Sequence, residues 1–117
     1  MSLTPPITIR PVSTADSQAL LDIYRPYVEH TAITFEYEVP TVEEFTRRIR
    51  HTLKRYPYLA AEKDGQLLGY AYAGPFHERA AYDWCAEVSI YIRTDARGTG
   101  IGKKLYEALE HALTAQN

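Results

Sequence analysis

The chain has 117 residues, of which 45% are hydrophobic and 24% are charged, a balance typical of one small globular domain. It contains no apolar run long enough to cross a membrane and no secretory signal pattern, so we expect a cytoplasmic protein. The formal net charge of −2 gives no electrostatic reason to expect a nucleic-acid partner, and the spacing of its four histidines and single cysteine indicates no metal site.

The N-terminal segment predicts a short strand followed by a helix. Residues Ile7–Arg10 alternate like a strand, which Pro11 should stop. Residues 13–16, Ser-Thr-Ala-Asp, match a capping box, and apolar residues then recur at helical spacing as far as Val28. Because proline lacks the backbone N–H, we expect Pro26 to kink this helix or to end its regular part early.

A second helix and a hairpin follow. Thr41 is the expected N-cap of the second helix, and Pro57 closes that stretch. Strands are predicted at Tyr58–Glu62 and Leu67–Ala73. They are joined around Asp64-Gly65, a pair typical of a type I′ turn, in which both central residues have positive φ.

The last part of the chain predicts a fourth strand and a third helix. The strand covers Trp84–Arg93, and the helix includes the periodic run Leu105–Ala115. The alternation of a strand puts two sets of side chains on opposite faces. One face carries Glu87, Ser89 and Tyr91, and the other carries Val88, Ile90 and Ile92.

A glycine-rich loop, Arg97–Lys103, joins this strand to this helix. Backbone N–H groups at a helix start bind anions, and glycines let a phosphate come close, so the loop predicts a phosphorylated ligand. Three residues rather than four separate Gly98 from Gly102-Lys103, and Lys104 follows, which excludes a Walker A loop. The G-x-G-x-G spacing near the end of the chain also excludes a dinucleotide-binding fingerprint.

The remaining pattern, Arg97-x-x-Gly100-x-Gly102, resembles the pyrophosphate loop of the GNAT N-acetyltransferase superfamily. Five further segments look like the phosphinothricin N-acetyltransferase group of that superfamily: residues 31–36, 55–59, 69–75, 81–84 and 86–92. The resemblance runs from Ile7 onward. It implies an α/β fold with a mixed α+β sheet, in the order β-α-α-β-β-β-α, and acetyl-CoA as co-substrate with no metal.

The chemistry of such a transfer needs a base, because an amine attacks a thioester only after it has lost its proton. Glu87 is the candidate, since burial beside apolar neighbours would raise its pKa toward a useful value. From the residues alone, a strand-edge glutamate paired with an arginine is an equal alternative. The resemblance favours the base role, and it also suggests the backbone N–H near Val88 as the oxyanion donor.

The resemblance also implies the acetyl-CoA contacts. The main chain of the fourth strand would pair with the pantetheine arm, while the side chains of the same residues are more simply core. The loop would hold the pyrophosphate with its amides, and Arg97 would add charge, unless it is an ordinary solvated arginine. The expected contacts are Ile90, Tyr91, Ile92, Arg97, Gly98, Thr99, Gly100, Ile101, Gly102 and Lys103.

For the amino-acid substrate, the resemblance implies Phe35, Tyr72, Arg79 and Tyr82 together with Glu87. Arginine binds carboxylate and phosphinate groups bidentately, and tyrosine hydroxyls are directional donors. Ordinary packing is an even alternative for Tyr72 and Phe35. Phosphinothricin, methionine sulfoximine and methionine sulfone are the candidate substrates.

The chain departs from the family pattern at its end, where a complete domain continues with a fifth strand, a fourth helix and a closing hairpin. We therefore interpret residues 1–117 as a single GNAT domain without its C-terminal third, with weak or no activity if this is the whole molecule. An uncovered strand edge would favour association, and a homodimer is expected. The alternatives are a peptide or protein N-acetyltransferase, and a non-catalytic acyl-CoA-binding or dimerising module.

Overall fold

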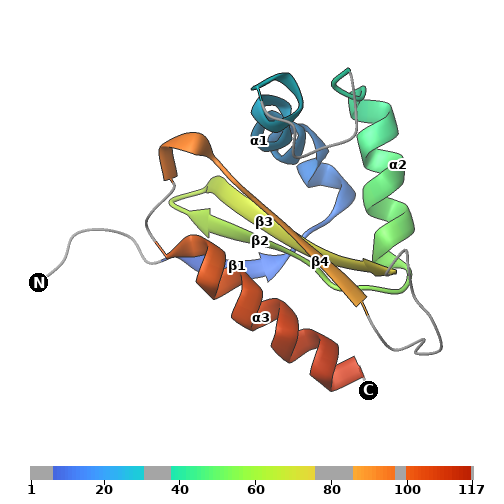
Figure 1. Ribbon diagram of the computed structural model, residues 1–117, viewed down its shortest axis with the longest axis vertical. Coiled ribbons are helices and arrows are strands. Elements are labelled where there is room, and N and C mark those ends of the chain that lie inside the picture. Colours follow the sequence, from blue (N-terminus) through green and yellow to red (C-terminus); the bar gives the residue numbers. More distant parts are fainter. Residues whose placement is uncertain (1–6, 31–37, 76–85, 97–99, 117) are drawn as a thin grey trace, which may run out of the picture.

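The computed structural model describes residues 7–30, 38–75, 86–96 and 100–116. An antiparallel four-stranded sheet lies between two helices on one face and one helix on the other (Figure 1). This confirms the expected fold class of helices and strands and the order of its elements, and all strand pairs in the described sheet are antiparallel. The elements are β1 (Thr8–Pro11), η1 (Thr14–Asp16), α1 (Ser17–His30), α2 (Val42–Leu53), β2 (Tyr58–Lys63), β3 (Gln66–Pro75), β4 (Ala86–Ile92), η2 (Thr94–Ala96) and α3 (Ile101–Gln116).

The strands follow the order β1-β2-β3-β4, and each pairs with its neighbour in sequence. The β2–β3 turn is of the expected kind, because φ is 54° at Asp64 and 78° at Gly65. Pro11, which we expected to stop this strand, is the last residue of β1 and lies opposite Leu59. A proline is tolerated there because β1 is an edge strand of the described sheet.

Helix α1 begins as expected and ends later than expected. Ser13 and Asp16 form a capping box, which opens the 3-10 turn η1 before the helix proper. Pro26 lies inside the helix, which continues to His30, so the expectation of an early end is wrong. Tyr24 and Tyr27, on either side of Pro26, are both buried. Their packing against the sheet stabilises the last turn in spite of the missing N–H.

Helix α2 is capped by Thr41, whose hydroxyl accepts a hydrogen bond from the Glu44 N–H. The Glu44 carboxylate also binds Arg47 and Arg48, at 2.7 and 3.0 Å. Hydrogen bonds from these two guanidinium groups lower the pKa of Glu44 to about 2. The first turn of α2 thereby orients the Arg48 side chain.

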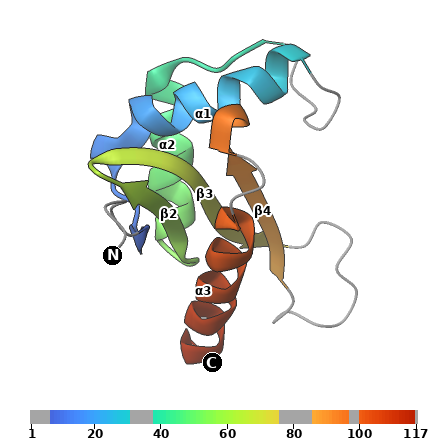
Figure 2. The same cartoon turned by 90° about the vertical axis from the view of Figure 1, so that its left-hand side faces the viewer.

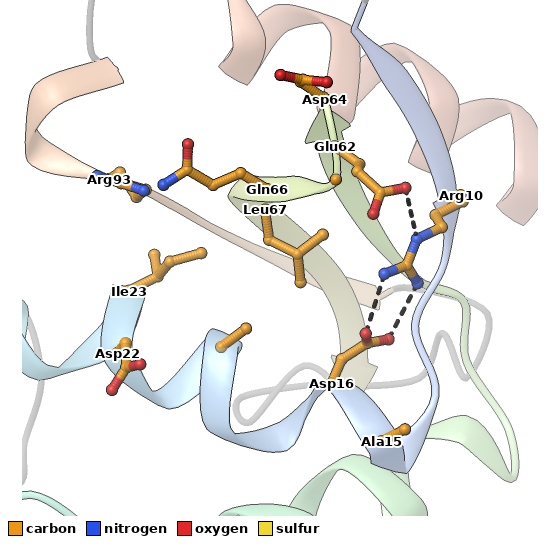
Figure 3. A pocket seen from close by; sticks show the side chains of 12 residues that line it. Arg10, Ala15, Asp16, Asp22, Ile23, Glu62, Asp64, Gln66, Leu67 and Arg93 are labelled. Atoms are coloured by element: carbon orange, nitrogen blue, oxygen red, sulfur yellow. Dashed lines mark hydrogen bonds and ion pairs between the residues drawn. The ribbon is translucent and has the colours of Figure 1, made fainter.

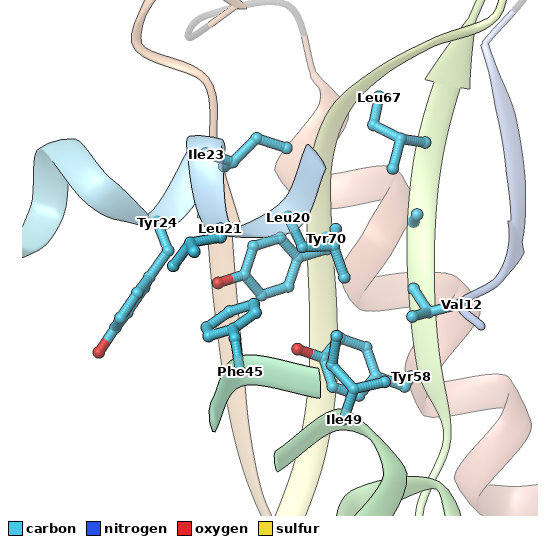
Figure 4. Close-up of a cluster of buried hydrophobic side chains, with 11 residues drawn as sticks. Val12, Leu20, Leu21, Ile23, Tyr24, Phe45, Ile49, Tyr58, Leu67 and Tyr70 are labelled. Carbon is cyan, nitrogen blue, oxygen red and sulfur yellow. The ribbon is translucent and has the colours of Figure 1, made fainter. Parts of the chain in front are cut away.

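Two separate cores hold the helices on the sheet. Leu20 of α1 and Ile49 of α2 are fully buried against the rings of Tyr58 and Tyr70 (Figure 4). Helix α3 covers the opposite face, as a second view shows (Figure 2). Its buried stripe agrees with the periodicity of the sequence and consists of Ile101, Leu105 and Leu109, with Leu113 partly buried.

A network centred on Arg10 ties β1 to α1 and β2. The Arg10 guanidinium donates two hydrogen bonds to the Asp16 carboxylate, at 2.9 and 3.0 Å, and one to Glu62 at 3.2 Å (Figure 3). Asp16 also accepts the Ser13 N–H at 2.9 Å. The bonds from Arg10 hold the pKa of Asp16 below its usual range. One carboxylate therefore both caps the helix entry and binds the first strand to it.

We expect Asp16→Asn to lower the free energy of unfolding at pH 7 by about 1.5 to 3 kcal/mol, the usual value of charged hydrogen bonds. Because the pKa of Asp16 is depressed by folding, its contribution is complete above the unfolded pKa of about 3.9 and disappears as pH falls through the folded pKa. Urea unfolding of the variant should therefore depend less on pH below about pH 4.

Asp22→Asn is the matched control, since Asp22 is exposed and accepts an i,i+4 hydrogen bond from Gln18 on the helix surface. Equal stability losses in the two variants would contradict the role of the Arg10 network.

Candidate functional site

Strand β4 carries the side chains expected on each face. Val88, Ile90 and Ile92 pack against the core beneath α3, whereas Tyr91 packs against the core beneath α1 and α2. Residue 87 lies in the strand opposite Gly74 of β3. The side chain of Glu87 lies outside what the structure describes, so its role as a base stays a prediction.

The β3–β4 register determines which main-chain groups of β4 face the edge of the described sheet. The Arg93 N–H donates to the Leu68 carbonyl at 2.8 Å, which makes these two residues a hydrogen-bonded pair. Such pairs alternate along antiparallel strands, so the N–H and C=O groups of Val88, Ile90 and Ile92 point away from β3. The same alternation turns the main chain of Tyr91 into the sheet. Of the three strand residues expected to bind acetyl-CoA, Ile90 and Ile92 therefore have edge-facing main-chain groups.

The Tyr27 hydroxyl occupies part of this edge. It donates a hydrogen bond to the Ile92 carbonyl at 2.7 Å and accepts one from the Ile92 N–H at 3.3 Å. The Tyr91 ring meets Tyr27 and Tyr24 edge-on, with 5.1 Å between ring centroids in both pairs. Helix α1 therefore contacts the C-terminal end of β4 through its tyrosines.

The start of α3 combines two glycine positions with different requirements. Gly100 has a φ of +81°, which a side chain would strain, and its carbonyl accepts the Lys104 N–H at 3.2 Å. Gly102 lies close to β4, since an added Cβ would be 3.1 Å from Cδ1 of Ile92. The amides of Ile101, Gly102 and Lys103 lie in the first helical turn, where N–H groups have no helical acceptor of the ordinary kind.

Several expected site residues lie outside the described part of the chain. These are Phe35, Arg79, Tyr82, Arg97, Gly98 and Thr99. Tyr72 is described: it is half-buried and stacks on Tyr58, with 4.8 Å between ring centroids. Tyr72 pairs with Ser89 of β4, so the structure brings it within two strand positions of residue 87.

A cleft of about 740 Å³ lies elsewhere, between α1 and the β2–β3 hairpin (Figure 3). None of the predicted site residues lines it. Its cationic residue Arg10 binds Asp16 and Glu62, and Arg93 binds Asp95 at 2.7 Å. These ion pairs belong to the Arg10 network and its surroundings, and the cleft is distinct from the site that the sequence predicts.

A smaller hollow of about 70 Å³ does contain a predicted residue, Tyr72. Tyr58 and Tyr70 line it beside Tyr72, and Arg48 and Thr52 of α2 contribute to its wall. The sequence analysis did not single out these four residues. The signal in the sequence was a set of aromatic residues, at positions 70 and 72 of one predicted strand and at position 58 of the strand before it. Only the register of the two strands shows that the three rings meet.

The described ranges contain neither a membrane-spanning helix nor a group of metal-binding side chains. Among the described residues, no helix has the length and apolar character needed to cross a bilayer. Within the same ranges, no three His, Cys, Asp or Glu side chains are grouped so as to hold a metal ion.

Comparisons with known proteins agree with this fold. A family model described as an acetyltransferase (GNAT) domain matches residues 9–117. The phosphinothricin N-acetyltransferase of Streptomyces viridochromogenes is 38% identical over 111 residues, which are 95% of this chain and 61% of that protein. The L-methionine sulfoximine/L-methionine sulfone acetyltransferase of Salmonella typhimurium is 32% identical and covers 88% of this chain. The chain spans 61% of the length of that relative too.

Solved structures give the same result. A phosphinothricin acetyltransferase from Sinorhizobium meliloti in complex with AcCoA superposes with a TM-score of 0.86 at 38% identity, covering 93% of this chain and 60% of that chain. A ribosomal-protein-alanine N-acetyltransferase from Brucella melitensis superposes with a TM-score of 0.87 at 33% identity, covering 93% and 68%.

We expect Gly100→Ala to lower the free energy of unfolding by about 1 to 2 kcal/mol, because an L side chain is strained at positive φ. Gly74→Ala is the control: nothing lies within 4 Å of an added Cβ and φ is not positive there, so stability should stay equal or rise slightly. Thermal unfolding of both variants tests this, and an unchanged Gly100→Ala melting temperature would argue against the described helix start.

Proposed function

Since the chain belongs to the GNAT acetyltransferase family, we propose that it moves the acetyl group of acetyl-CoA to the amino group of a small amino acid. The observation that carries this proposal is the row of edge-facing main-chain groups on β4, which leads to the N-terminus of α3. The 38% identity to a phosphinothricin N-acetyltransferase supports the amino-acid class of substrate. We propose residues 1–117 as a single domain of this kind.

The donor groups suit acetyl-CoA. Main-chain N–H and C=O groups at a strand edge can pair with the amides of the pantetheine arm, and Ile90 has such groups without a partner in β3. Ile92 would have to exchange its bonds to Tyr27. The N-terminus of the 16-residue helix α3 is suited to the pyrophosphate, together with the loop residues that precede it. Acetyl-CoA supplies a thioester, the electrophile in this reaction.

In the proposed reaction Glu87 takes a proton from the amino group, and the nitrogen forms a bond to the thioester carbonyl carbon. The carbonyl oxygen gains charge in this step, and the edge-facing N–H of Val88 is the proposed donor to it. The carbon–sulfur bond then breaks, and CoA leaves as a thiolate that takes up a proton. Substrate recognition would involve Tyr72 together with Phe35, Arg79 and Tyr82. Arg79 would bind one of the two acidic groups of a phosphinothricin-like substrate, which carries a carboxylate as well as a phosphinate.

A second candidate is a protein N-acetyltransferase, favoured by the similarity to the ribosomal-protein-alanine enzyme. The two candidates differ in the size of the acceptor. We also propose that the protein is a cytoplasmic homodimer. The position of β4 at the edge of the described sheet supports association, because an edge strand can pair with another chain. Sedimentation of the purified chain tests the dimer.

We expect Glu87→Gln to lower kcat for acetylation of phosphinothricin at least about 100-fold, because the amide cannot accept the proton. Binding of acetyl-CoA, measured by calorimetry, should stay within error of the parent. Glu107→Gln, at an exposed position of α3, is the control and should leave kcat unchanged. A Glu87→Gln variant with parental kcat would exclude this residue as the base.

An acceptor panel separates the candidates. Release of free CoA is measured with phosphinothricin, methionine sulfone, methionine sulfoximine and an alanine-terminated peptide, each with acetyl-CoA. We expect release with the small amino acids and none above background with the peptide. The reverse preference would favour the protein acetyltransferase, and CoA binding without release would favour the non-catalytic module. The same panel on a chain extended by the expected C-terminal third shows whether 117 residues suffice.

A further inference from the structure

Three tyrosine rings form a stack on the face of the sheet that α1 and α2 cover. Tyr58 of β2 lies opposite Tyr72 of β3, and Tyr70 precedes Tyr72 by two positions on the same strand. Ring centroids are 4.8 Å apart for Tyr58–Tyr72, 5.9 Å for Tyr58–Tyr70 and 6.3 Å for Tyr70–Tyr72. Figure 4 shows the phenols of Tyr58 and Tyr70 with their oxygens turned to the same side.

The hydroxyls of Tyr58 and Tyr70 are buried without a hydrogen bond. The two side chains are 4% and 1% exposed. Among the described residues, neither hydroxyl makes a hydrogen bond. A buried hydroxyl without a partner costs about 1 to 3 kcal/mol, so two of them side by side need an explanation other than core packing.

The protonation of these tyrosines suits hydrogen-bond donation. Burial raises the pKa of Tyr58 and of Tyr70 above its ordinary value, with the neighbouring tyrosines adding to the effect. Both phenols are therefore neutral at pH 7 and keep the proton that a donor needs.

The hollow that these rings line is bordered by side chains that can donate hydrogen bonds. The Arg48 guanidinium and the Thr52 hydroxyl of α2 join the tyrosines, and the described lining contains no carboxylate. The positive charge of Arg48 also acts on Tyr58. The volume of about 70 Å³ is that of about two water molecules, which suits the oxygens of one small acidic or sulfone group and no larger side chain.

The hollow lies beside the position of the proposed base. Tyr72 pairs with Ser89, and the adjacent pairs along β3 and β4 are Ala73 with Val88 and Gly74 with Glu87. Tyr72 is thus two strand positions from residue 87, whereas Tyr70, which pairs with Tyr91, is four positions from it. Two positions are a short span, about 7 Å along a strand.

We propose that the tyrosine hollow is a subsite for an oxygen-rich, hydrogen-bond-accepting group, a carboxylate, phosphinate or sulfone, at the far end of the amino-acid side chain. This inference rests on the proposed function and adds a selection rule to it. The Tyr58 and Tyr70 hydroxyls and Arg48 donate to the group, which favours amino acids with acidic or sulfone side chains over aliphatic ones of equal length.

The test measures binding and turnover separately in Tyr70→Phe, which removes one oxygen and keeps the ring. Calorimetry with phosphinothricin should show affinity at least about 10-fold weaker than in the parent, the usual cost of a lost hydrogen bond to a charged group. Norleucine, which has an apolar side chain, should bind both proteins equally. Tyr106→Phe, at a 48% exposed position of α3, is the matched control and should change neither affinity.

Stability is the second readout. Because the Tyr70 hydroxyl has no partner in the described structure, Tyr70→Phe should melt at the same temperature as the parent or higher. Lower stability with unchanged phosphinothricin affinity would overturn the subsite, since the hydroxyl would then serve the core. Equal loss of affinity for phosphinothricin and norleucine would also overturn it.

Measuring phosphinothricin binding and CoA release separately distinguishes a failure of this inference from a failure of the proposed function. Phosphinothricin affinity that depends on the Tyr70 hydroxyl, with no release of CoA even from the chain extended by the expected C-terminal third, would support the subsite and contradict the transferase. Release of CoA with equal kcat/KM for phosphinothricin in the parent and in Tyr70→Phe would support the transferase and overturn the subsite.

Discussion

The close pairing of β3 with β4 is the constraint on which the rest of the structure depends. An added Cβ at Gly69 would lie 3.0 Å from the carbonyl oxygen of Tyr91, which is tighter than an ordinary contact, so glycine favours this approach. The register that results decides which side chains of β4 face each helix layer. It also decides which main-chain groups point away from the sheet. A shift by one residue would reverse both assignments.

The edge of β4 is coupled to α1 through Tyr27. This hydroxyl satisfies both main-chain groups of Ile92 from a residue 65 positions away in sequence. Pairing of another chain or of a ligand along the full edge must therefore compete with an intramolecular bond. Among the described residues, no side chain bonds the main chain of Val88 or Ile90 in this way, which makes their part of the edge the more accessible one for pairing.

The aromatic residues divide between packing and chemistry. Tyr91 meets Tyr24 and Tyr27 in edge-to-face contacts, which are favourable arrangements of ring quadrupoles. The rings of Tyr58 and Tyr70 bury large apolar areas as well, but their hydroxyls have no partner in the described structure. Buried donors of this kind lower stability, and each therefore requires an explanation beyond apolar packing.

The sequence by itself determined the order of the elements, the β2–β3 turn and the capping of the first two helices, because these features depend on residues that are neighbours in the chain. Its motifs also indicated the family. Local rules were wrong only where tertiary packing opposed them: α1 continues through Pro26 because Tyr24 and Tyr27 are buried on either side of it. The contacts within the candidate site could not be predicted from neighbouring residues in this way. Strand period alone placed Ser89 and Tyr91 on one face, but it could not tell that Tyr58, Tyr70 and Tyr72 stack or that Arg48 joins them. Those contacts join different strands and a helix, so only the register and the helix packing of the tertiary structure decided them.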